Sequence, residues 1–88
     1  MPVDSYASEL LEIARCLKKA GFDPSIRGEY AARFVYVEHQ RRAAEVSKAE
    51  EGWFVELWEE PSEISIRDEV QDTIPFAVEQ VLDWLRNQ

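Results

Sequence analysis

A chain of 88 residues is long enough for one small domain. The hydrophobic content of the chain, 45%, is too high for a disordered segment. Ten Lys and Arg residues against 18 Asp and Glu residues give a net charge of −8, which disfavours binding to nucleic-acid phosphates. No apolar run approaches the ~20 residues of a membrane span. The single cysteine, Cys16, excludes an internal disulfide and is typical of a reducing compartment. We therefore expect one cytoplasmic domain over residues 1–88 that binds neither nucleic acid nor membrane.

The first twenty residues predict a helix with one apolar side. Asp4 or Ser5 can cap its N-terminus, because either side chain accepts a backbone N–H bond that has no partner within the helix. Gly21 suits the left-handed position after the last turn, and Pro24 prevents continuation. Steps of three and four residues place on one face Tyr6, Leu10, Ile13, Ala14 and Leu17.

Four strands are expected after a stretch, residues 23–33, that shows no clean period. Each strand either is rich in β-branched and aromatic residues or alternates apolar with polar side chains. The short links between them, one of which ends at Gly52, predict an antiparallel meander. The expected strands are residues 34–37, 44–48, 53–59 and 64–67.

A second helix is predicted to close the chain. Asp72 or Thr73 can cap it, and Pro75 is tolerated in a first turn. Its apolar stripe is formed by Ile74, Ala77, Val78, Val81, Leu82 and Leu85. The order α-β-β-β-β-α predicts an α+β two-layer sandwich, in which both helices pack on one face of an antiparallel sheet of three to four strands.

The predicted sheet has bulky apolar side chains on both faces. The face toward the helices is expected to contain Val35, Val37, Ala44, Val46, Trp53, Val55, Leu57, Ile64 and Ile66. The outer face is expected to carry the aromatic residues Phe34, Tyr36, Phe54 and Trp58, with Glu56 and Arg67 as charges at its rim. An aromatic outer face needs cover, and the sequence leaves three sources open: residues 23–33 with Ile26 and Tyr30, a second subunit, or a partner.

The remaining reactive side chains form no recognisable site. His39 has no second histidine or cysteine at zinc-ligand spacing, and no local motif supports its pairing with Cys16 as a nucleophile and base. Glu56 lies between Phe54 and Trp58 on one strand face, so cover over that face would raise its pKa. The sequence therefore predicts no catalytic, metal-binding or cofactor-binding residue.

The acidic charge is concentrated in the second half of the chain. Residues 45–88 hold three Lys and Arg against twelve Asp and Glu, a balance of −9. The layout resembles small uncharacterised bacterial α+β proteins, and in size, charge and helix–strands–helix order it resembles the acidic, dimeric secretion chaperones, although it is shorter than their usual fold.

We expect a non-enzymatic protein-interaction module of immunity-like, antitoxin-like or chaperone-like type, which uses the outer face to bind a protein partner or a second copy as a homodimer. The alternative is a small enzyme or ligand-binding protein with a pocket between sheet and helices, involving His39 or Glu56.

Overall fold

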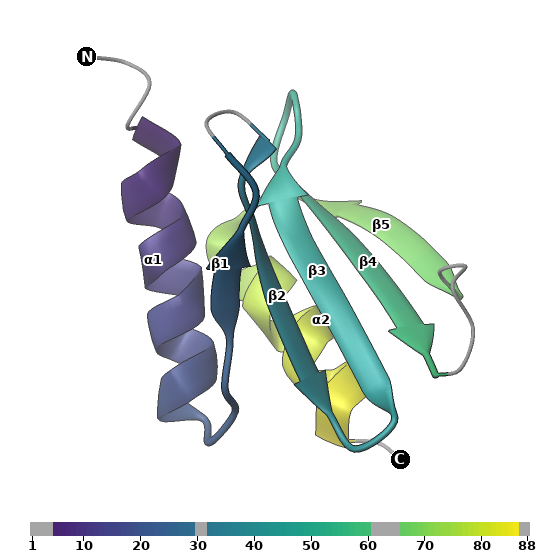
Figure 1. The fold of residues 1–88 in the computed structure, drawn as a ribbon. Coiled ribbons are helices and arrows are strands. Elements are labelled where there is room, and N and C mark those ends of the chain that lie inside the picture. Colours follow the sequence, from purple (N-terminus) through teal and green to yellow (C-terminus); the bar gives the residue numbers. More distant parts are fainter. Residues whose placement is uncertain (1–4, 30–31, 61–65, 87–88) are drawn as a thin grey trace.

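A five-stranded antiparallel sheet lies between an N-terminal and a C-terminal helix in the chain (Figure 1). The computed structural model describes residues 5–29, 32–60 and 66–86. Its elements are α1 (Ser5–Lys19), β1 (Ser25–Arg27), β2 (Phe34–His39), β3 (Arg42–Lys48), β4 (Trp53–Glu59), β5 (Arg67–Gln71) and α2 (Ile74–Arg86). The strands are arranged in the order β1-β2-β3-β4-β5, so the predicted meander and the two-layer α+β class are confirmed.

The first helix ends as its sequence predicts. Gly21 has a φ of 102°, a conformation that suits a residue without a Cβ atom. The N–H of Gly21 bonds the carbonyl of Lys18, and the N–H of Phe22 bonds the carbonyl of Leu17, which is the Schellman pattern. Leu17 is fully buried and Phe22 packs against the same core, so the chain turns tightly from α1 into the sheet.

The sheet has one more strand than the sequence predicts. Residues Ser25–Arg27 pair with β2 as a short edge strand, in a segment without a clear pattern of its own. Ile26 lies opposite Val35, which is buried on the helix-facing side of the sheet. Residues Ser25–Arg27 therefore extend the sheet sideways, and their backbone does not fold over the outer face. Tyr30 lies outside the described residues.

The last strand differs in position from the prediction. We expected it at residues 64–67, but β5 is Arg67–Gln71, and Ile66 is 57% exposed outside the core. Ile64 lies outside the described residues. Leu57 is the cross-strand partner of Arg67, so Arg67 lies on the helix-facing side and its expected place on the outer face is wrong. Strand pairing at the sheet edge overrides the local apolar alternation on which the prediction rested.

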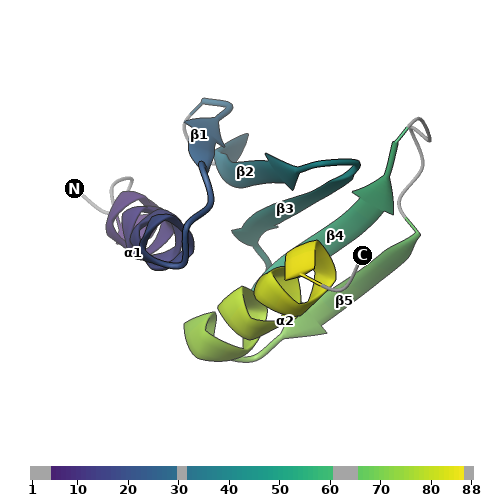
Figure 2. The ribbon, with the colours of Figure 1, turned by 90° about the horizontal axis from the view of Figure 1, so that it is seen from below.

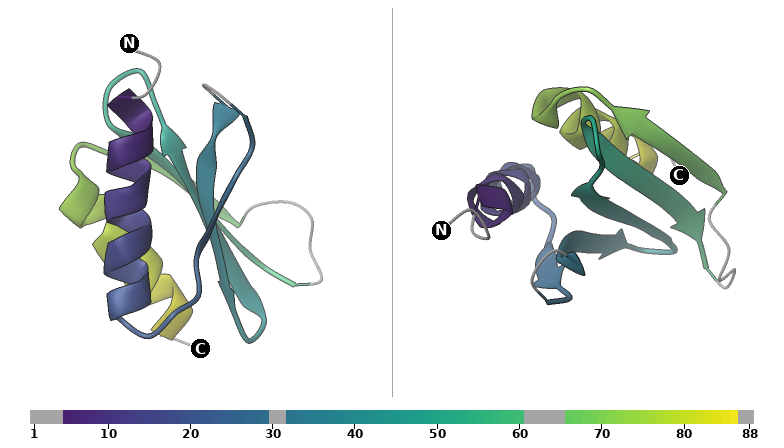
Figure 3. Two further views of the ribbon diagram at one scale, coloured as in Figure 1. Left: turned by 60° about the vertical axis from the view of Figure 1, so that its left-hand side comes forward. Right: turned by 90° about the horizontal axis from the view of Figure 1, so that it is seen from above.

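The second helix closes the core. Thr73 caps it, because its Oγ1 accepts the N–H of Phe76 at 3.4 Å and its carbonyl accepts the N–H of Ala77. Figure 2 and Figure 3 show α1 and α2 on the same side of the sheet, as predicted, with α1 beside β1 and α2 under the last strands. Helix and strand residues meet in one core: Leu10, Ile13, Leu17, Val35, Val37, Ala44, Val46, Trp53, Val55, Leu57, Ala77, Val78, Val81 and Leu85.

Candidate interaction surface

The outer face is the side of the sheet that carries no helix (Figure 3). Strand pairing aligns its side chains in three rows that cross the strands. The first row runs through Phe34, Ser47, Phe54 and Val70; the second through Tyr36, Glu45, Glu56 and Asp68; and the third through Glu38, Ala43 and Trp58. The first row is apolar apart from Ser47, the second holds three carboxylates beside Tyr36, and the third joins Glu38 to Ala43 and Trp58.

Tyr36 and Trp58 meet across the middle strand. Their ring centroids are 6.2 Å apart, and between them lies Ala43, which is fully buried although it is on the outer face. An alanine at this position lets the two rings approach, because they come from strands that are not adjacent. Both rings remain half-buried. Arg27 of β1 adds a cation–π contact, with its guanidinium carbon 4.0 Å from the centre of the Tyr36 ring.

A second aromatic pair follows the same principle. Phe34 and Phe54 lie on either side of Ser47, in the row that continues to Val70 on β5. The two phenylalanines are half-buried, whereas Val70 is 54% exposed. On the outer face, β3 therefore places the small side chains of Ala43 and Ser47 between the aromatic side chains of β2 and β4.

Three carboxylates line up on neighbouring strands between these apolar rows. Glu45 is the direct partner of Glu56, and Glu56 is the direct partner of Asp68. Burial raises the pKa of the Glu45 carboxyl, the facing Glu56 carboxylate raises it further, and Arg27 acts in the opposite direction. Burial likewise raises the pKa of Glu56, with a further contribution from Asp68. Like charges at directly opposite positions destabilise a sheet, so folding alone does not favour this row.

The structure brings together five of the six residues that the sequence proposed for the surface: Phe34, Tyr36, Phe54, Glu56 and Trp58. The sixth, Arg67, lies on the opposite side, where its Nε donates to Glu69 at 3.0 Å. Asp68 and Val70 were missed because they become outer residues only in the true register of β5. The role of Ala43 was missed because alternation shows which side a residue faces but not what covers it.

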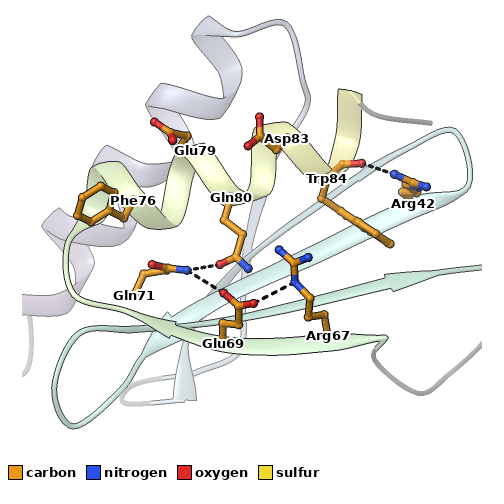
Figure 4. Close-up of a pocket in the computed structure, with 9 residues that line it drawn as sticks. All are labelled: Arg42, Arg67, Glu69, Gln71, Phe76, Glu79, Gln80, Asp83 and Trp84. Atoms are coloured by element: carbon orange, nitrogen blue, oxygen red, sulfur yellow. Dashed lines mark hydrogen bonds and ion pairs between the residues drawn. The ribbon is translucent and has the colours of Figure 1, made fainter.

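A pocket lies on the other side of the sheet, between α2 and β5 (Figure 4). Its volume is about 440 Å³, and it forms where the helix-facing side chains of β5 are polar: Arg67, Glu69 and Gln71. In Figure 4, Gln80 of α2 points toward this strand, and the Nε2 atom of Gln71 donates both to the carboxylate of Glu69 and to the Oε1 atom of Gln80. Neither His39 nor Glu56 lines it, contrary to the residues we expected for a pocket.

This hydrogen-bond network leaves one buried donor. Because the Glu69 carboxylate only accepts, Gln71 must present its amino group, and Gln80 must therefore present its oxygen to Gln71. The Nε2 atom of Gln80 is buried and has no acceptor in the part of the chain that the structure describes. A buried donor of this kind is costly, so the pocket is the second candidate site.

One end of the pocket is fixed by Arg42 and Trp84. The indole N–H of Trp84 donates to the carbonyls of Ala43 and Trp58, at 3.2 Å each. Arg42 stacks over the indole at 4.1 Å, donates from Nη1 to the Trp84 carbonyl at 2.9 Å, and pairs with Glu59. Since the Trp84 carbonyl belongs to the last turn of α2, Arg42 satisfies the end of the helix and attaches it to the sheet.

The other reactive groups lie apart from these two sites. The His39 ring packs edge-on against Phe22, at 5.1 Å between centroids. Cys16 is exposed, and it lines a second pocket between α1 and α2. Among residues 5–29, 32–60 and 66–86 there is no cluster of three or more His, Cys, Asp or Glu side chains suited to a metal ion. Within the same ranges no helix is long and apolar enough to cross a membrane.

Comparison with protein-family models, with curated proteins and with solved structures finds no match to this chain. A functional argument therefore depends on the chemistry of the two sites.

Proposed function

We propose that the protein is a non-enzymatic interaction module that binds a protein partner through its outer face. The observation that carries the proposal is the half-buried state of Phe34, Tyr36, Phe54 and Trp58 on a sheet face that neither helix covers. Each aromatic side chain offers roughly 150–250 Å² of surface. Partial exposure of four gives an apolar area of the order that is functional on monomeric proteins, about 300–600 Å².

The character of this surface supports a binding role of the kind found in immunity proteins, antitoxins and secretion chaperones. Aromatic side chains are favoured at the centres of protein interfaces because they bury a large area with few rotatable bonds. The sheet beneath them is held by pairing of β2, β3 and β4 along six or seven residues each. A rigid platform of this kind loses little conformational freedom on binding. A bacterial, cytoplasmic setting fits such a role and is part of the proposal.

The test compares one aromatic residue on each side of the molecule. A photo-crosslinking residue replaces Ser47, which lies between Phe34 and Phe54 on the outer face. Crosslinking is carried out in host cells with otherwise wild-type, Trp58→Ala and Phe76→Ala backgrounds. Phe76 is the control because it is 56% exposed on α2, beside the pocket. We expect a defined crosslinked protein that is lost with Trp58→Ala and retained with Phe76→Ala, while thermal denaturation shows that both variants are folded at the temperature of the experiment. Equal crosslinking in all three backgrounds, or loss only through unfolding, contradicts the proposal.

The second candidate function is binding of a small ligand in the pocket between α2 and β5, as a binding protein or a small enzyme. The buried Nε2 donor of Gln80 favours it, because a ligand oxygen would supply the missing acceptor. The volume of about 440 Å³ lies within the usual range of ligand sites.

Thermal-shift screening of wild type and Gln80→Leu tests this second function. A ligand that stabilises wild type but not the variant would support it. If no compound discriminates between them and Gln80→Leu is simply more stable, the Gln80 amide is an unpaired group of the fold and the second function fails.

A further inference from the structure

The three carboxylates of the outer face carry information about the partner, beyond the aromatic side chains. Glu45, Glu56 and Asp68 form one continuous line because each is the direct cross-strand partner of the next. No hydrogen bond or ion pair joins any of them to another of the described residues. Arg27, the cation that lowers the pKa of Glu45, is engaged with the Tyr36 ring. In the free protein, Arg27 therefore offsets part of the charge at Glu45, and no hydrogen bond or ion pair to another described residue offsets the charge at Glu56 and Asp68.

The line is placed between two apolar strips. On one side are Phe34, Phe54 and Val70, on the other are Ala43 and Trp58, and Tyr36 continues the line beside Glu45 and contacts Trp58. Burial between these strips raises the pKa of the Glu45 and Glu56 carboxyls, so both carboxylates are partly deprived of water. A cation brought between the strips would meet charges that water screens weakly, and its attraction would be stronger than at an open surface.

We propose that the outer face binds a basic protein segment, with the charged groups of two or more Lys or Arg side chains on the carboxylate line and their aliphatic stems against the strips. This inference rests on the proposed function and names the class of partner. Neighbouring strands are about 4.8 Å apart, so the line is about 10 Å long. Alternate side chains of an extended segment face the same way and are about 6.8 Å apart, so two basic residues separated by one residue fit along the line, and the residue between them points away from the sheet.

Charge complementarity distinguishes this occupant from a second copy of the chain. A two-fold contact through the outer face would place Glu45, Glu56 and Asp68 against the same three carboxylates of the other copy. Glu38, in the neighbouring row of the same face, has the same sign. Juxtaposed like charges disfavour such a pairing, whereas a basic segment removes the repulsion that already exists within the face.

The probe is the synthetic peptide acetyl-Leu-Arg-Leu-Arg-Leu-amide, and its counterpart with Glu in place of Arg is the peptide control. Binding is followed by NMR of the ¹⁵N-labelled full chain at low salt. We expect shifts at the amides of residues 45, 56 and 68 and at the indole of Trp58, with the basic peptide only. Raising the salt should weaken binding, since the contacts are electrostatic.

The decisive variant is Glu45→Gln with Glu56→Gln, matched by Glu50→Gln with Glu51→Gln, which changes net charge equally at two exposed positions of the β3–β4 loop. We expect the first pair to weaken binding about tenfold and the second by less than about twofold, because only the first removes direct contacts. Equal weakening by both pairs, binding of the acidic peptide, no shift at millimolar basic peptide, or dimerisation through Trp58 overturns the inference.

Failure of the inference can be separated from failure of the proposed function. If crosslinking in the host depends on Trp58 but persists in the Glu45→Gln, Glu56→Gln variant, the outer face binds a partner that is not basic. If it depends on neither, both proposals fall.

Discussion

The two faces of β4 differ in how completely folding accounts for them. Trp53, Val55 and Leu57, on the helix side, are at most 3% exposed and belong to the core. On the outer side, Phe54 and Trp58 are half-buried, and Glu56 lies between two other carboxylates across the strands. The inner face is what a small α+β domain requires in order to fold. The outer face includes a repulsive row and exposed ring surface, which binding explains better than folding does.

A single sheet separates the folding role of its inner face from the proposed binding role of its outer face. Adjacent residues of one strand face opposite sides, so a substitution in the core need not disturb the outer face. Leu57 and Trp58 are neighbours in sequence, yet one contacts the helices and the other meets Tyr36. Variants at such adjacent positions are the direct way to test the difference.

The largest effect is expected from Leu57→Ala. Its side chain is 1% exposed, so truncation leaves a cavity in the core and should lower the free energy of unfolding by about 3 kcal/mol. Trp58→Ala should lower it by only about 1 kcal/mol, because the indole is already partly in contact with water. Urea denaturation of the two variants measures both values. Equal losses would mean that the outer face is as much a part of the core as the inner one.

An intermediate effect is expected from Arg42→Ala on the helix side. The substitution removes the 2.9 Å hydrogen bond to the Trp84 carbonyl and the stacking on the indole, and we expect a loss of about 1–2 kcal/mol. Arg41→Ala is the matched control, since Arg41 is the exposed neighbour in the same hairpin and its removal should change stability by less than about 0.5 kcal/mol. Thermal denaturation distinguishes them. Similar losses would show that the contacts of Arg42 with α2 contribute little.

The smallest effect, and the opposite sign, is expected from Glu56→Gln. Because the folded-state pKa of Glu56 is raised, the folded state binds more protons than the unfolded state between the ordinary and the raised value. The contribution of Glu56 to the free energy of unfolding therefore falls as pH rises through that window, and the fall is complete above the raised pKa. The glutamine variant should be more stable than wild type at pH 7, by about 0.5 kcal/mol, and the gain should disappear below the ordinary glutamate pKa.

Urea denaturation of wild type and Glu56→Gln at pH 7 and pH 4 measures this difference, with Glu50→Gln as the exposed control. A gain that is the same at both pH values would exclude the repulsion between carboxylates as its cause.

Much of this fold could be predicted because its strongest elements have local signals. The limits of β4, Trp53–Glu59, follow from an unbroken run of strand-forming residues, and α2 begins after its predicted cap Thr73. β1 and β5 could not be placed in this way. β1 is three exposed residues, and β5 is the mostly charged and polar segment Arg67–Gln71. Both are edge strands whose only clear determinant is pairing with a neighbour, which local sequence does not encode.

The candidate surface was predicted to the extent that it depends on alternation. Phe34, Tyr36, Phe54, Glu56 and Trp58 share a face because the limits of β2 and β4 were nearly correct. The carboxylate line could not be predicted, since it requires the registers of both β3 and β5 relative to β4. The buried amide of Gln80 packs against the polar inner side of β5. This polar side was not predicted, because the last strand was expected at residues 64–67 and not at Arg67–Gln71.

The hydrogen bonds of Trp84 have a practical consequence. Its indole N–H donates to the backbone carbonyls of Ala43 and Trp58, and the side chain of Trp58 contacts Tyr36 on the outer face. Trp53 is buried in the core, Trp84 bonds the sheet backbone, and Trp58 lies on the outer face. The three indoles therefore have three different environments. Intrinsic fluorescence can therefore follow occupation of the outer face without any attached dye: Trp58 responds directly, Trp84 responds through the backbone pair, and Trp53 provides an internal reference.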